Sequence, residues 1–89
     1  MDLNEDFLEA AIKNLRRVTE ENDMLSFPFA LGEYLSSRQG LMIAYNQTLP
    51  ELIESEERIK RLKALSKRYD DRVAEITKKL NYLPFTNKQ

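Results

Sequence analysis

Residues 49–83 read LPELIESEERIKRLKALSKRYDDRVAEITKKLNYL, with apolar residues at heptad spacing over more than four heptads. This period is typical of a helix packed against other helices, so we expect a long, coiled-coil-like helix over about residues 49–82. Thr48, Pro50 and Glu51 would open it as a capping box with an early proline, and Pro84 would end it. One row of its a/d seam is Leu52, Ile59, Ser66, Val73 and Leu80, and the other is Ser55, Leu62, Tyr69, Ile76 and Leu83.

Two shorter helices are predicted before it, over about residues 3–25 and 30–46. Asp2 followed by Glu5 has the character of a capping box, and the break at 26–29 contains a proline. The first helix has an apolar face at 3–4 spacing, and Asn22 falls on that seam, where a buried Asn can fix helix register. The residues of this face are Leu8, Ala11, Leu15, Val18 and Leu25, with Ile12 beside them.

The predicted fold is therefore all-α, a single helical domain over residues 1–83 followed by a flexible tail over 84–89. The chain has two glycines and three prolines, too few for many turns. A three-residue link at 46–48 permits a tight helical hairpin, whereas a proline within one continuous helix would only bend it. The pattern thus predicts a helical hairpin or three-helix bundle with a long third helix, and leaves a kinked helix as the alternative.

Composition argues against catalysis. The 89 residues include no cysteine and no histidine, which removes thiolate chemistry, the Ser-His-Asp arrangement and the commonest metal ligand. No Gly-rich phosphate loop is present. We therefore expect a non-enzymatic protein without a cofactor or bound metal.

The charge pattern suggests a location and a class of partner. Acidic residues stand where the basic region of a signal peptide would be, and Glu33 and Arg38 interrupt the most apolar stretch, 27–45. We therefore expect an intracellular, cytoplasmic protein. The net charge of −1 and the lack of aromatic residues between Arg58 and Arg68, in the basic run of the third predicted helix, disfavour nucleic acid as a partner.

The predicted helix lengths leave part of the seam uncovered. At 1.5 Å per residue the third helix is about 50 Å long and the second about 25 Å, so the second reaches only to about Leu65. Burying each large apolar side chain beyond that point is worth roughly 1.5–3 kcal/mol. We therefore expect an adaptor or oligomerisation module, a homodimer or a subunit of a larger helical assembly. The predicted partner-binding seam is Tyr69, Val73, Ile76, Leu80 and Leu83.

A stripe of small residues four apart lies on the second helix: Gly32, Ser36, Gly40 and Ala44. Such spacing puts the residues on one face and lets another backbone approach closely. We expect a close helix-packing groove. A helix of the same chain would fill it in one interpretation, and a second copy or a partner helix in the other.

The third helix also carries a basic run. In one interpretation it is a solvated face balanced by glutamates one turn away, as in Glu54–Arg58, Glu56–Lys60, Glu57–Arg61 and Glu75–Lys79. In the other, it contacts an anionic surface such as lipid headgroups. The candidate contacts are Lys60, Arg61, Lys67, Arg68 and Arg72.

The run Leu31-Gly32-Glu33-Tyr34-Leu35, followed by a proline-marked bend and a long charged helix, resembles the BAR-type helical region of sorting nexins. The resemblance covers about residues 27–80. It implies a dimer of kinked helices that places the basic run against a curved anionic membrane, and so a protein peripheral to a membrane. The chain is less than half as long as such a domain, and its net charge is slightly negative.

Overall fold

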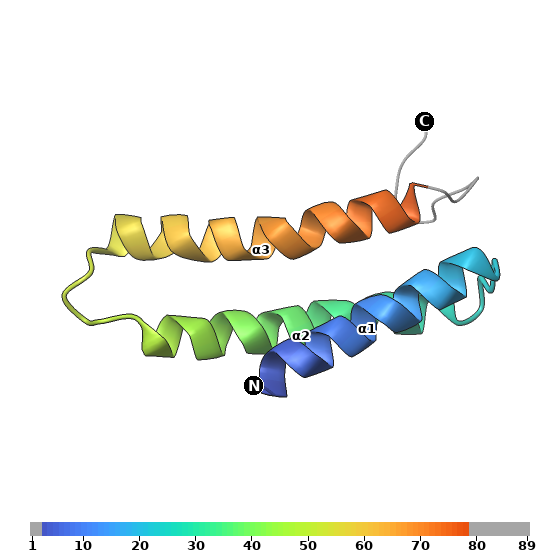
Figure 1. Cartoon of the computed structure of the whole chain (residues 1–89), viewed down its shortest axis with the longest axis horizontal. Coiled ribbons are helices and arrows are strands. Elements are labelled where there is room, and N and C mark those ends of the chain that lie inside the picture. Colours follow the sequence, from blue (N-terminus) through green and yellow to red (C-terminus); the bar gives the residue numbers. More distant parts are fainter. Residues whose placement is uncertain (1–2, 79–89) are drawn as a thin grey trace.

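The computed structural model describes residues 3–78 and consists of three helices (Figure 1). They are α1 (Leu3–Glu20), α2 (Phe27–Thr48) and α3 (Ser55–Thr77). α1 and α3 run in the same direction, and α2 runs antiparallel to both. The predicted all-α, three-helix arrangement is confirmed. The tail 84–89, together with Leu80 and Leu83 of the predicted seam, lies outside the described residues.

α1 ends at Glu20, five residues before the predicted end. Asn22 adopts a left-handed conformation with φ 57°, which asparagine tolerates better than most residues. The N–H of Asn22 donates to Thr19 O at 3.0 Å, and that of Asp23 donates to Val18 O at 3.0 Å. These two bonds are the Schellman motif, which terminates helices. Asn22 therefore ends α1 rather than continuing its seam, and Leu25 is 88% exposed.

α2 begins three residues earlier than predicted, because Pro28 falls in its first turn, where a proline is tolerated. The Asp23 carboxylate accepts the Ser26 N–H at 3.2 Å. Hydrogen bonds from Ser26 lower the pKa of Asp23 below its usual range. Phe27 is 1% exposed and belongs to the core, so the predicted break is the start of a helix.

α3 begins at Ser55, six residues later than predicted. Thr48 is the last residue of α2, and its hydroxyl donates to Tyr45 O at 2.7 Å. Thr48 therefore does not cap the start of α3, and the predicted capping box is wrong. Residues 49–54 instead form the connection between α2 and α3. The chain reverses there, as the hairpin interpretation requires (Figure 1).

The Arg58 guanidinium holds this reversal. It donates to Asn46 O at 2.7 Å and to Pro50 O at 2.6 Å. The last carbonyls of a helix lack partners within the helix, and a basic side chain satisfies them favourably. The Arg58 side chain therefore binds backbone carbonyls at and just after the end of α2, and the predicted pair with Glu54 is not formed.

A polar cluster fixes the register of α2 against α3 near their other ends. Asp70 accepts the Tyr34 hydroxyl at 2.5 Å and the Arg38 guanidinium at 3.0 and 3.1 Å. Burial, and then the hydrogen bond to Asp70, raise the pKa of Tyr34. Together with the Asn46–Arg58 contact, this cluster fixes a register in which α2 lies beside α3 over the whole length of α3.

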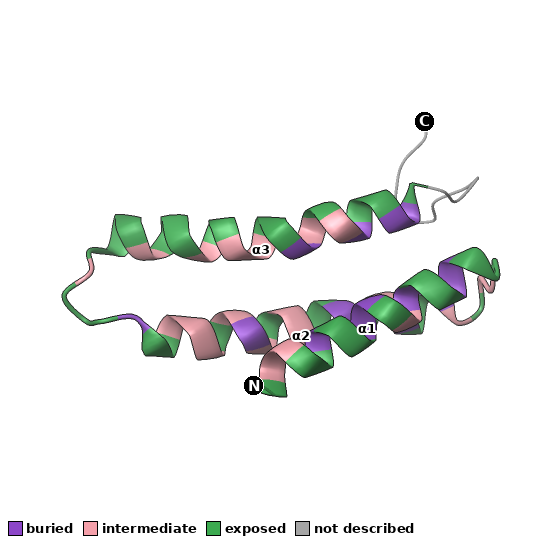
Figure 2. Cartoon of the chain, in the orientation of Figure 1, coloured by how far each residue is buried: buried purple, intermediate pink, exposed green. Residues whose placement is uncertain are grey.

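The prediction that the distal seam is under-covered is wrong. Tyr69, Val73 and Ile76 are 3%, 8% and 3% exposed, because α2 is longer and α3 shorter than predicted and α1 packs over this end. In Figure 2 the buried residues gather where the three helices overlap. From Ser55 to Arg68, by contrast, no residue of α3 is fully buried. The core consists of Leu8, Ala11, Ile12, Leu15, Val18, Phe27, Ala30, Tyr34, Leu41, Tyr69, Val73 and Ile76.

Candidate functional site

Among residues 3–78, the half of the molecule next to the 49–54 connection consists of α2 and α3. α1 begins near the middle of the α2–α3 hairpin and covers its other half (Figure 1). Beyond the first turn of α1, the space between α2 and α3 remains open as a groove of about 750 Å³. We call it the open groove.

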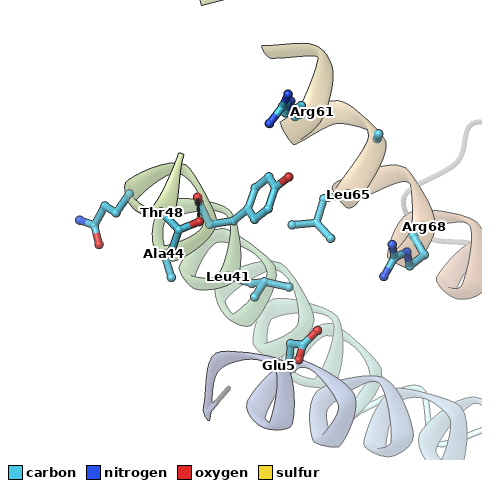
Figure 3. A pocket seen from close by; sticks show the side chains of 10 residues that line it. Glu5, Leu41, Ala44, Thr48, Arg61, Leu65 and Arg68 are labelled. Atoms are coloured by element: carbon cyan, nitrogen blue, oxygen red, sulfur yellow. Dashed lines mark hydrogen bonds between the residues drawn. The ribbon is translucent and has the colours of Figure 1, made fainter. Parts of the chain in front are cut away.

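The open groove has an apolar floor, two arginines on its α3 side and Glu5 of α1 at one end (Figure 3). Leu41 and Ala44 from α2 and Leu65 from α3 form the floor, and the Leu65 side chain points into the space. Arg61 and Arg68 line it from α3. The full lining is Glu5, Leu41, Ala44, Tyr45, Gln47, Thr48, Arg61, Ala64, Leu65 and Arg68.

Next to this groove, an ion pair joins α1 to α3. Arg72 donates to both carboxylate oxygens of Glu9, at 2.8 and 2.9 Å, and lies 5.8 Å from the centre of the Tyr69 ring. The hydrogen bond from Arg72 lowers the pKa of Glu9, and the same contact raises the pKa of Arg72. A helix that packs between α2 and α3 on this side therefore meets an arginine on its flank.

The five cations predicted to contact an anionic surface do not form one patch. Arg61, Arg68 and Arg72 fall within about 40° of one another around α3, on the side of α1 and the open groove. Arg61 pairs with Glu57 at 3.0 Å, which confirms one of the predicted pairs one turn apart. Lys67 pairs with Asp71 at 2.8 Å, which raises the pKa of Lys67. Within residues 3–78, Lys60 and Arg68 make no ion pair.

A second surface lies on the outward side of α2. Phe29, Leu35 and Ile43 are 77%, 51% and 53% exposed. At 3.6 residues per turn they fall within an arc of about 120°. α2 has two charged residues: Arg38, which pairs with Asp70, and Glu33, which accepts a hydrogen bond from Asn14 of α1 at 3.4 Å. Neither lies within this arc, which we call the outer face of α2.

The small-residue stripe of α2 is only partly the predicted packing groove. A spacing of four residues advances about 400°, so the stripe drifts around the helix by about 40° at each step. Ala44 lines the open groove, and a Cβ on Gly40 would lie 3.7 Å from Asn4 Oδ1 of α1. Ser36 is exposed, and a Cβ on Gly32 would meet nothing within 4 Å. At Gly32 the prediction of close packing within the chain is wrong, because the drift turns this residue outward.

No group of three or more acidic, histidine or cysteine side chains is placed to hold a metal within residues 3–78. In the same range, no helix is both long and apolar enough to cross a bilayer. Comparison of the chain with family models, curated proteins and solved structures finds no match.

Sequence reasoning missed three features of these surfaces. It paired Arg58 with Glu54 and named no partner for Asp70, since side-chain partners on another helix leave no periodic signal. The outer face of α2 did have a signal: between Glu33 and Glu51 the chain carries a single charged residue, Arg38. A solvent-facing helix normally carries charges on its outer side.

Proposed function

We propose that this protein is a non-enzymatic helical interaction module that associates with a second copy of itself through the outer face of α2. The observation that supports this proposal is the uncharged arc bearing exposed Phe29, Leu35 and Ile43. Exposed apolar surface of this kind on a soluble helix marks an interaction site when it is contiguous. The proposed function of the module is therefore to hold two copies of the chain together.

A second copy suits this surface because the arc carries no charge. In a two-fold dimer the same patch meets itself, so a charge close to the axis would face a like charge from the second copy. Gly32 and Ser36 lie between the apolar side chains and allow two α2 helices to approach closely. Of the small-residue stripe, Gly32 and Ser36 are thus proposed to contact a second copy.

The proposed interface replaces the distal seam of α3. Tyr69, Val73 and Ile76 are already in the core of the chain, and a partner could reach them only by displacing α1 or α2. The outer face of α2 is accessible without any change of fold.

Light scattering after gel filtration, over a range of concentrations, tests the proposal. We expect a mass of about twice the 10.5 kDa of the chain, and a shift toward a single chain for Ile43→Lys. Leu52→Lys is the matched control, because Leu52 is 96% exposed but lies in the 49–54 connection. A wild-type monomer at every concentration would refute self-association.

The alternative is a BAR-like membrane-surface module, which would bind anionic lipid through the basic run. Its support is weaker, because Arg61, Lys67 and Arg72 already pair with carboxylates of the same chain. Co-sedimentation with phosphatidylserine vesicles separates the two proposals. Vesicle binding that is lost in Lys60→Glu with Lys67→Glu, while Ile43→Lys binds normally, would favour the membrane module.

A further inference from the structure

The open groove continues the path that α1 follows. In the other half of the molecule, α1 lies against both α2 and α3 and buries Leu8, Ile12 and Leu15 in the shared core. α1 starts at Leu3, and beyond its first turn the open groove lies between α2 and α3, not filled by any residue of the range 3–78. The apolar floor continues there as Leu41, Ala44 and Leu65. The vacant half is thus lined like the half that already holds a helix.

The basic flank continues along the same path. Arg72 pairs with Glu9 of α1. On the same side of α3, Arg68 lies one turn before Arg72, and Arg61 lies two turns before Arg68. Arg68 makes no ion pair within residues 3–78. Arg61 pairs with Glu57 of its own helix, where the two side chains are 44% and 46% exposed. An exposed pair of this kind contributes little, so Arg61 can exchange its partner readily.

We propose that the open groove binds an amphipathic helix of a different protein, placed where α1 would continue. Its apolar face would cover Leu41, Ala44 and Leu65, and carboxylates on its flank would pair with Arg61 and Arg68. Since these arginines are seven residues apart, carboxylates two turns apart, about 10 Å, match them. The Glu9–Arg72 pair shows the same contact formed within the chain.

A different protein, rather than a second copy, fits this groove. Within the described range, α1 is the acidic amphipathic helix of the chain, and its apolar face is already buried. A second copy would have to unpack its own core to offer that helix. This binding site is separate from the outer face of α2, so it stands whether or not the chain self-associates.

Peptide binding to the intact chain tests this proposal. The probe is a fluorescent 18-residue helical peptide with leucines at 3–4 spacing on one face and two glutamates seven apart on its flank. The control peptide has lysines in place of the two glutamates. We expect saturable anisotropy with the glutamate peptide and at least tenfold weaker binding of the lysine peptide.

Two matched variants locate the site. Arg68→Glu should weaken the glutamate peptide about tenfold and strengthen the lysine peptide, since Arg68 lines the groove. Lys67→Glu makes the same change of net charge on the adjacent residue, which faces solvent beside Asp71, and should leave both affinities nearly unchanged. Circular dichroism verifies that each variant keeps its helices.

Three outcomes would overturn the proposal. One is the absence of saturable binding by either peptide. Another is an equal effect of Arg68→Glu and Lys67→Glu, which would mean general electrostatic attraction. The last is displacement of the labelled peptide when more of the protein itself is added and the dimer forms, which would mean that a second copy fills the open groove. A monomeric chain that binds the glutamate peptide would refute self-association alone.

Discussion

Replacing Asp70 by alanine tests whether the polar cluster between α2 and α3 stabilises the fold. Asp70 accepts hydrogen bonds from Tyr34 and from Arg38. Tyr34 is 2% exposed, so in Asp70→Ala its hydroxyl would lose its partner inside the protein. A buried, unsatisfied hydroxyl costs about 1–3 kcal/mol.

The ion pair adds less to this loss. The side chains of Arg38 and Asp70 are 31% and 45% exposed, so solvent screens them and the pair contributes at most about 1 kcal/mol. We therefore expect Asp70→Ala to lower the free energy of unfolding by about 2–3 kcal/mol. For a domain of this size, 2 kcal/mol corresponds to a fall in Tm of about 8–16 °C.

Asp71→Ala is the matched control. Asp71 is the next residue of α3 and pairs with Lys67, but these side chains are 64% and 73% exposed. Both substitutions replace aspartate by alanine within the same helix, so the change in helix propensity cancels. Thermal unfolding followed by circular dichroism should show a far smaller effect for Asp71→Ala. Equal shifts in Tm for the two variants would refute the role of Asp70.

A double-mutant cycle assigns the loss to a contact. In the Tyr34→Phe background no hydroxyl is left to be orphaned, so Asp70→Ala should destabilise the chain by about 1 kcal/mol less than in the wild type. Additive effects would show that Tyr34 and Asp70 act independently, contrary to the 2.5 Å contact.

Four further predictions concern stability and association. Asn22→Gly should match or raise Tm, whereas Asn22→Ala should lower stability by about 1 kcal/mol, since φ is 57° there; equal Tm values would contradict the Schellman ending of α1. Thr19→Val should raise the free energy of unfolding in urea by about 1 kcal/mol, because Thr19 Oγ1 is buried without a hydrogen-bond partner among residues 3–78; a loss of stability would contradict this. The raised pKa of Tyr34 favours its neutral form in the folded state, so its contribution is present below the ordinary pKa of 10.0 and is lost as pH rises above it; an alkaline titration should be shallower in Tyr34→Phe, and identical curves would refute this. Gly32→Leu should keep the helix content and raise the stability of the single chain by up to about 1 kcal/mol, because glycine is a poor helix former and a Cβ there meets nothing within 4 Å, yet it should abolish the dimer in light scattering; an unchanged dimer would exclude Gly32 from the interface.

Local sequence signals identified the elements and most of the core. Leu8, Leu15 and Val18 belong to the apolar face at 3–4 spacing and are 0–1% exposed, as predicted for the inner face of the first helix. Periodicity specifies a face from neighbouring residues of the same helix, so it needs no knowledge of the partner. The same reasoning correctly selected Tyr69, Val73 and Ile76 as the apolar side of the third helix, although it assigned them to a partner.

Helix ends were less predictable, because they depend on which competing local structure wins. Thr48, Pro50 and Glu51 have the spacing of a capping box, yet Arg58 binds the carbonyls of residues 46 and 50 and keeps this segment as a connection. Asn22 continues an apolar seam in the sequence but takes a left-handed conformation in the chain. In both places a hydrogen bond to a backbone carbonyl decided between two patterns that the residues alone permitted.

By itself the sequence determined that this protein is a set of amphipathic helices, since the period of its apolar residues depends only on neighbours along the chain. The tertiary structure decided which surfaces remain open. α1 packs over Tyr69, Val73 and Ile76 but does not extend over Leu65. The exposed end of the hairpin is therefore the one next to the 49–54 connection, whereas the helix lengths predicted the opposite end. Burial is a property of the whole assembly of helices, because it depends on where each one starts and on the register set by Asp70 and Arg58.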